Sequence, residues 1–412
     1  MPKIKPFRGI RPSQEYVDRV VLSVENLSLS EAKKIISSNP YSYLNMLVPK
    51  LGNSFLRGTK QEITYKKIHE NFEDFIERGI LVQDDRPAIY IYQVADEHFI
   101  QTGIWTSTSI DDYLSNTIKK HELTRADREK ALIDYLQETG MDANPVLITY
   151  LPQSQIQAII SNVIATKSDL HFVLDRLTHQ LWKVDQPDQL AALSKAFEAI
   201  PASYIADGHH RAAAASVLGI QRRKLNLKHT GNESYNFFNS VYMSTDQLRI
   251  FEFNRLVKDI GSLSVDQLIR QLSVHFEIER LSGFAAFKPQ QLHEFGMYVD
   301  HCWYRLRAKP DIYEQKDVVD GLDVSLLQDY ILSPILQITD PRTDSRLTFV
   351  GGMVPTQTSI EQVDQGDNTL LFTLFPIAIE QLIQVADAGE VMPPKSTWVV
   401  PKFQVGLVIH SL

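Results

Sequence analysis

Residues 202–219 read ASYIADGHHRAAAASVLG, which places a short apolar run, a glycine turn and an alanine-rich stretch in direct succession. The apolar run predicts a strand that ends at Asp207. The alanines after Gly208 favour a helix, and Gly219 is a suitable residue for the C-terminal end of that helix. This stretch therefore predicts a strand, a tight turn and the N-terminus of a helix.

The turn after this strand carries residue types that hold a phosphate. The first N–H groups of a helix have no partner within the helix, and the helix dipole places about half a positive charge there. Gly208 lets the backbone approach an anion closely, and Arg211 adds a guanidinium donor. His209 and His210 could donate to phosphate oxygens or carry a proton near neutral pH. Asp207 could orient a histidine, hold Mg²⁺ or act as a base; its alternative role is that of a helix cap beside packed histidines.

The composition is that of a globular protein from a reducing compartment. The chain has 412 residues, 43% of them hydrophobic and 22% charged, a length typical of about two or three domains. Its single cysteine, Cys302, excludes an internal disulfide and favours a cytoplasmic location. No apolar run approaches the roughly 20 residues that span a bilayer, so we expect no membrane partner. The net charge of −8 argues against a nucleic-acid partner, because broad nucleic-acid binding needs a basic face.

Strands and helices are mixed along the chain, and predicted hairpins outnumber predicted β-α-β units. This pattern predicts an α+β fold with mixed or antiparallel sheets. The predicted elements are helices at 65–78, 124–136 (with Thr124 as N-cap and Gly140 beyond the end), 189–199, 264–276, 325–336 and 377–388, strands at 88–94 and 99–105, and hairpins that join 171–175 to 180–184 and 237–243 to 248–253.

The motif IADGHHRAAA at residues 205–214 resembles the signature of a bacterial family of unknown function, number ten-fifteen. That family is similar in this motif to the ParB/sulfiredoxin superfamily, which includes nucleotide-hydrolysing ParB domains, sulfiredoxin, and kinases that phosphorylate free serine. The resemblance covers nearly the whole chain. Its other stretches are PFRGIR at 6–11, HELT at 121–124, DPRTD at 340–344, FVGG at 349–352 and VMPPKSTW at 391–398.

The resemblance implies a ParB/sulfiredoxin-like nucleotide-binding core and an additional α/β region. We expect the boundary near the polar stretch 228–234. Residues 1–230 would then hold the phosphate-binding core. Residues 231–412 would form a C-terminal α+β region that contributes the loop 392–398 to the site. In that loop Lys395, Ser396 and Thr397 are candidate phosphate donors, although Pro-Pro could simply end the preceding helix.

Further candidates lie outside these two motifs. His121 and Glu122 precede the predicted helix 124–136, and Glu122 could be a general base, a Mg²⁺ ligand or part of a surface pair. Arg8 could hold an anion or pin the first strand. The segment 21–28 departs from the family pattern, since Glu25 stands where an acid is expected but the neighbouring prolines and tyrosine are absent.

Two arginines in the second half have mainly structural interpretations. Arg342 and Asp344 lie in a turn-rich stretch, where a salt bridge between them is favoured over ligand contact. Arg255 follows the second predicted hairpin, where a solvated surface position is favoured, although it could reach a site at the sheet edge.

Together these observations predict a nucleotide-dependent, kinase-like phosphotransferase for a small hydroxylated metabolite, with free serine the first candidate by resemblance. Mg²⁺ with ATP, ADP or CTP would be the cofactor, and the phosphates would lie on residues 208–211. Candidate catalytic residues are Glu25, Glu122, Asp207 and His209, and candidate substrate contacts are Arg8 and His121. The alternative is a regulatory nucleotide-binding protein that hydrolyses its nucleotide or does no chemistry. Sulfiredoxin chemistry is disfavoured, because His209 stands where a reactive cysteine would be expected.

Overall fold

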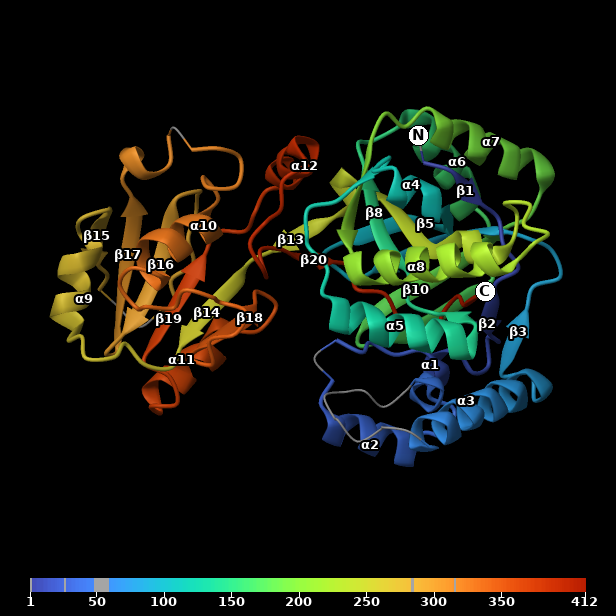
Figure 1. The fold of residues 1–412 in the computed structure, drawn as a ribbon, viewed down its shortest axis with the longest axis horizontal. Helices are drawn as coiled ribbons and strands as arrows, with labels where there is room; N and C mark the ends of the chain where they lie inside the picture. Colours follow the sequence, from blue (N-terminus) through green and yellow to red (C-terminus); the bar gives the residue numbers. More distant parts are fainter. Residues whose placement is uncertain (1, 26, 48–58, 283–284, 315) are drawn as a thin grey trace. The chain divides into compact units, whose positions relative to one another are not determined.

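The computed structural model describes the chain except for residues 1, 26, 48–58, 283–284 and 315. The chain forms two units (Figure 1). Unit 1 comprises residues 1–248 and 401–412, and unit 2 comprises residues 249–400. The expected boundary after residue 230 lies inside unit 1, because the chain beyond it adds β12 to the centre of the unit 1 sheet.

Unit 1 is built on a nine-stranded sheet with the strand order β6-β11-β8-β12-β5-β4-β10-β9, and β1 pairs with β5. The sheet is mixed, since β12 runs parallel to β8 whereas β11 runs antiparallel to it. Two short strand pairs, β2 with β3 and β7 with β21, complete the unit. The strands are β1 (Ile4–Lys5), β2 (Ile10–Pro12), β3 (Leu81–Gln83), β4 (Ile89–Ala95), β5 (Ile100–Ser109), β6 (Ile118–Lys119), β7 (Met141–Asp142), β8 (Val146–Tyr150), β9 (Leu170–Leu174), β10 (Leu177–Val184), β11 (Ser203–Asp207), β12 (Phe237–Ser244) and β21 (His410–Ser411).

Helices pack on this sheet, and α5 and α8 lie side by side (Figure 1). The core of unit 1 joins residues of the sheet to the apolar faces of α6, α7 and α8, for example Ile160, Phe197 and Leu218. The helices are α1 (Val17–Val20), α2 (Leu29–Ser38), α3 (Thr59–Glu77), α4 (Ile110–Leu114), α5 (Ala126–Thr139), α6 (Ser154–Ile164), α7 (Pro187–Glu198) and α8 (His209–Leu225).

Unit 2 has an antiparallel six-stranded sheet in the order β15-β17-β16-β19-β14-β18, and a separate pair of β13 and β20. Its strands are β13 (Arg249–Phe251), β14 (Phe253–Val257), β15 (Phe276–Arg280), β16 (Glu294–Val299), β17 (Cys302–Ala308), β18 (Leu347–Gly351), β19 (Leu370–Leu374) and β20 (Trp398–Val400). Its helices are α9 (Val265–Leu272), α10 (Asp323–Leu327), α11 (Thr356–Asp364) and α12 (Ile379–Ala388).

The predicted α+β fold with mixed and antiparallel sheets is confirmed, as are the hairpin of β9 with β10 and Gly140 at the end of α5. The second predicted hairpin is wrong, because β13 pairs with β20 rather than with β12. The predicted helix 325–336 begins as α10, but its hydrogen bonding changes to a π-helical turn at residues 328–332. No helix among the described residues is both long and apolar enough to cross a membrane.

Two predicted helix boundaries are also wrong. Gly219 lies inside α8 rather than at its end, and a Cβ there would come within 2.4 Å of Ile110 and 2.5 Å of the Tyr235 carbonyl oxygen. The glycine therefore permits close packing rather than ending the helix. Thr124 is not the N-cap of α5; Arg125 occupies that position, and its N–H donates to His210 Nε2 at 3.0 Å.

Candidate functional site

The strand β11, Gly208 and the helix α8 form the predicted strand-turn-helix. Gly208 has φ = +96°, and a Cβ at this position would lie 2.9 Å from Arg211 Nε. Glycine is therefore favoured here both by backbone conformation and by space. No side chain caps the N-terminus of α8. The turn thus presents the positive end of a 17-residue helix at the end of β11.

Arg211 stabilises this turn through hydrogen bonds to neighbouring residues of unit 1. Its Nη2 donates to Asp207 Oδ2 at 2.5 Å, and its Nη1 donates to the Pro145 carbonyl oxygen at 2.5 Å and to Asn144 Oδ1. The guanidinium therefore ties α8 to the loop that precedes β8. Sequence reasoning assigned Arg211 to the phosphate, and that contact stays a prediction; the contacts that the structure gives are with Asp207, Asn144 and Pro145.

Lys402 is a second cation at the turn, and sequence reasoning missed it. Its Nζ lies 3.2 Å from Asp207 Oδ1 and 3.2 Å from Glu25 Oε1. Burial raises the pKa of Asp207, but the positive charges of Lys402 and Arg211 outweigh it and lower the pKa to about 2. Asp207 is therefore ionised at neutral pH, and a continuous chain of opposite charges links Glu25 to Arg211.

A pair of buried histidines also lies at the turn, where α8 begins. The rings of His121 and His209 are perpendicular, with centroids 4.5 Å apart. Burial lowers the pKa of His121 to about 4, and burial together with His121 lowers the pKa of His209 well below its usual value. Both rings are therefore neutral at pH 7. His209 Nδ1 lies 3.6 Å from Glu122 Oε2, whose side chain is 48% exposed.

The model of DUF1015, a family described as a protein of unknown function, matches residues 4–325. The chain belongs to the DUF1015 family. No curated protein matches it.

Solved structures that are similar to this DUF1015 chain share little sequence with it. A mutant of free serine kinase in complex with ADP is 15% identical with a TM-score of 0.36, over 74% of this chain and 92% of that one. A conserved hypothetical protein from Pyrococcus furiosus is 15% identical with a TM-score of 0.34, over 74% and 95%. SbnI from Staphylococcus aureus, truncated at its C-terminus, is 11% identical with a TM-score of 0.38, over 74% and 87%. These TM-scores are too low to transfer a binding site to this chain.

In this DUF1015 protein the structure brings two of the predicted carboxylates to the turn, Glu25 through Lys402 and Glu122 through His209. Arg8 is engaged elsewhere, since its Nε donates to the Asp84 carbonyl oxygen at 2.9 Å beside the Arg11–Asp84 ion pair. These contacts match the role of pinning the first strands.

The loop residues Lys395, Ser396 and Thr397 belong to unit 2, and their phosphate contact stays a prediction. Ser396 is buried, and its hydroxyl donates to the Pro393 carbonyl oxygen at 2.6 Å. The Lys395 ammonium lies 5.0 Å from the ring centroid of Phe253. Within unit 2, these contacts fix the loop that follows α12.

A protein-held Mg²⁺ does not fit the turn as it is arranged. Both carboxylate oxygens of Asp207 already accept from cations, Oδ1 from Lys402 and Oδ2 from Arg211. Among the described residues, no three or more His, Cys, Asp or Glu side chains form a group that could hold a metal ion.

Proposed function

We propose that this DUF1015 protein is a nucleotide-dependent phosphotransferase that acts on a small hydroxylated metabolite, with free serine as the first acceptor to test. The observation that carries the proposal is the position of Lys402, 3.2 Å from both Glu25 and Asp207. This position supports the proposal, because the Lys402 ammonium joins Glu25, a candidate base, to Asp207 in the turn where we propose that the phosphate binds.

The N-terminus of α8 and Lys402 supply positive charge to the nucleotide phosphates in this proposal. Phosphoryl transfer demands in-line positioning and neutralisation of charge rather than covalent work by the protein. A terminal phosphate at Gly208 would attract Lys402 away from its two carboxylates. Arg211 keeps its contacts with Asp207 and Asn144, and so holds the turn in shape.

The carboxylates Glu25 and Glu122 are the candidate bases. The acceptor hydroxyl oxygen forms a bond to the terminal phosphorus, and its proton passes to one of these carboxylates. The bond from that phosphorus to the bridging oxygen breaks, and the electron pair leaves with the shortened nucleotide. Release of Lys402 towards the phosphate would free Glu25 to accept the proton, whereas Glu122 is already 48% exposed.

Nucleotide binding tests the first half of the proposal. ATP, ADP and CTP, each with Mg²⁺, are titrated into the native protein, Lys402→Met and Lys183→Met. Lys183 is a matched control, because it is a half-buried lysine of unit 1 whose Nζ lies 3.2 Å from a carboxylate, that of Asp185. We expect Lys402→Met to weaken binding about tenfold or more, from the loss of one charge-assisted contact, and Lys183→Met to leave it unchanged. Equal affinities for both variants would contradict the phosphate site.

Turnover tests the second half. Formation of phosphoserine is followed by mass spectrometry with the native protein, Glu25→Gln and Glu122→Gln. The variant that lacks the base should keep its nucleotide affinity and lose about 100-fold or more in rate. Tight nucleotide binding without transfer to any hydroxylated acceptor would instead support the regulatory alternative.

A further inference from the structure

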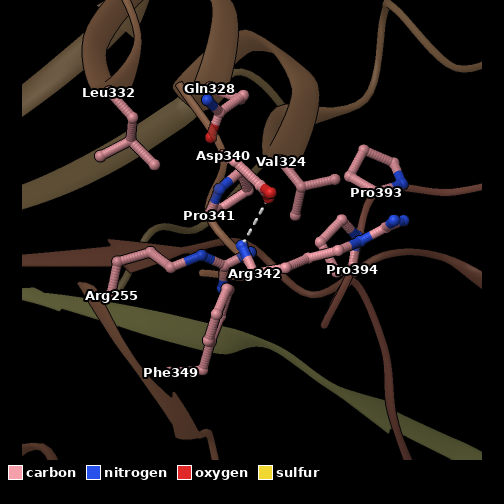
Figure 2. A pocket seen from close by; sticks show the side chains of 10 residues that line it. All are labelled: Arg255, Val324, Gln328, Leu332, Asp340, Pro341, Arg342, Phe349, Pro393 and Pro394. Atoms are coloured by element: carbon pink, nitrogen blue, oxygen red, sulfur yellow. Dashed lines mark hydrogen bonds between the residues drawn. The ribbon is translucent and has the colours of Figure 1, made fainter. Parts of the chain in front are cut away.

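Unit 2 contains a pocket of about 210 Å³ that the proposed function does not use. Its walls combine segments from across the unit: Arg255 of β14, Val324, Gln328 and Leu332, residues 340–342, Phe349 of β18, and Pro393 with Pro394 (Figure 2). The walls are mainly apolar, and their polar residues are Arg255, Gln328, Asp340 and Arg342.

Arg255 lies in the middle of β14 and is only 3% exposed. The solvated position that the sequence favoured is therefore wrong. Its Nη1 donates to the Phe253 carbonyl oxygen at 2.5 Å and its Nη2 to the Lys395 carbonyl oxygen at 3.1 Å. The guanidinium lies 4.5 Å from the ring centroid of Phe349, its cross-strand neighbour. Burial lowers the pKa of Arg255 to about 9, so it still carries its charge at neutral pH.

Arg255 has no carboxylate partner among the residues that the structure describes. By contrast, Arg305 and Arg346 of the same unit pair with Glu294 and Asp344. A buried charge is unfavourable unless an opposite charge compensates it. The protein around this pocket therefore leaves a positive charge to be matched by something else.

Arg342 adds a second cation at the exposed edge of the pocket. Figure 2 shows its side chain running towards Pro394. The predicted salt bridge with Asp344 is wrong, because Asp344 pairs with Arg346 at 2.7 Å. Asp340, the acid on the pocket wall, accepts from the Arg342 backbone N–H at 2.9 Å and from the Thr343 hydroxyl at 3.1 Å. Its carboxylate thus caps a turn rather than pairing with either guanidinium.

We propose that this pocket binds the carboxylate of a small organic acid, with Arg255 as the buried counter-charge and Arg342 as the outer donor. A guanidinium matches a carboxylate in shape and can donate to both of its oxygens. The apolar walls, among them Phe349 and Pro394, suit the carbon body of such an acid better than a bare inorganic anion.

Benzoate is the probe for this proposal, benzamide is its neutral analogue, and inorganic phosphate represents a bare anion. Each is titrated into the native protein by NMR. We expect saturable binding of benzoate, and binding weaker by about tenfold or more for benzamide and phosphate, since charge and apolar contact are both required. Benzoate binding no tighter than either comparison compound would overturn the proposal.

Three variants locate the binding. Arg255→Met replaces the buried charge with an apolar chain, Arg342→Ala removes the outer donor, and Arg270→Ala is the control, an exposed arginine on α9 outside the pocket. We expect benzoate affinity to fall about tenfold or more in Arg255→Met, to fall severalfold in Arg342→Ala, and to stay unchanged in Arg270→Ala. Unchanged affinity in both pocket variants would overturn the assignment.

If Arg255→Met does not fold, Arg342→Ala and the ratio of benzoate to benzamide affinity decide the question. The result is independent of the phosphotransferase proposal. Nucleotide affinity should be unchanged in Arg342→Ala, and benzoate affinity should be unchanged in Lys402→Met.

Discussion

Arg211 in unit 1 and Arg255 in unit 2 both donate to backbone carbonyl oxygens, but only Arg211 also contacts a carboxylate. The charge of Arg211 is matched by Asp207, which Lys402 shares. The charge of Arg255 is matched by no described residue, although Arg255 is the more deeply buried of the two. A paired arginine of this kind is explained by the fold alone. A buried arginine without a partner needs a further explanation, and a bound anion is the one that its pocket offers.

Removing Asp207 beside Arg211, or removing Arg255 itself, should give the largest difference in the free energy of unfolding. Asp207→Ala leaves Arg211 and Lys402 facing each other without their shared carboxylate, and we expect it to lower the free energy of unfolding by about 3 kcal/mol. This cost is at the low end of the range for breaking a buried ion pair, because the Asp207 side chain is 35% exposed. Arg255→Met removes an unmatched charge, so we expect it to stay within about 1 kcal/mol of the native protein. Urea unfolding at pH 7 measures both.

The pH dependence of the Asp207 effect follows from its pKa of about 2, below the value of about 3.9 in an unfolded chain. A lowered carboxyl pKa stabilises the folded state above about pH 4, and the effect is lost as the pH falls towards 2. The loss in the free energy of unfolding caused by Asp207→Asn should therefore shrink over that range.

Equal losses for Asp207→Ala and Arg255→Met at pH 7 would remove the distinction between the paired Arg211 and the unpaired Arg255.

Asp142 gives the same comparison for a buried carboxyl group. It is buried in unit 1, and its Oδ2 accepts from the Asn239 N–H at 2.8 Å. Burial raises the pKa of Asp142 to about 7. A carboxyl group can thus avoid an unmatched buried charge by keeping its proton, whereas the Arg255 guanidinium would have to lose a proton and keeps it at neutral pH.

This difference predicts a pH effect of intermediate size. Between about pH 4 and pH 7 the folded state holds a proton on Asp142 that the unfolded chain has lost, so stability falls as the pH rises through this range. We expect Asp142→Asn to remove this fall and to gain about 2 kcal/mol on the native protein between pH 4 and pH 7. Urea unfolding at both pH values measures it. A constant difference between the two proteins over this range would show that Asp142 is ionised throughout.

Local signals in the sequence predicted the unit 1 turn well. The apolar run, Gly208 and the alanines are neighbours in sequence, and each has a strong conformational preference of its own, so β11, the turn and the start of α8 followed directly. Lys402 carried no such signal, since it lies 195 residues from Asp207 and only the packing of the C-terminal residues into unit 1 brings it there.

The burial of Arg255 in unit 2 could not be predicted from the sequence. Whether an arginine on a strand is solvated or buried depends on the partners of that strand. Arg255 follows the second predicted hairpin, where a solvated position was favoured, but it lies in β14, which pairs with β18 and β19 inside the sheet of unit 2. Neither partner is close to β14 in sequence, so local patterns could not indicate that Arg255 is buried.

The smallest expected effect concerns Gly208, and it tests whether the contacts of Arg211 depend on the backbone conformation of the turn. In Gly208→Ala the new methyl group combines a φ of +96° with a contact of 2.9 Å to the Arg211 guanidinium. Gly79→Ala is the matched control, since Gly79 has φ = +67° in the same unit but no neighbouring atom within 4 Å of its Cβ position. We expect Gly208→Ala to cost about 1 kcal/mol more than Gly79→Ala in urea unfolding, because both carry backbone strain and only one also displaces Arg211. Equal costs would mean that Arg211 moves aside freely, and that its contacts with Asp207 and Asn144 do not hold the turn in shape.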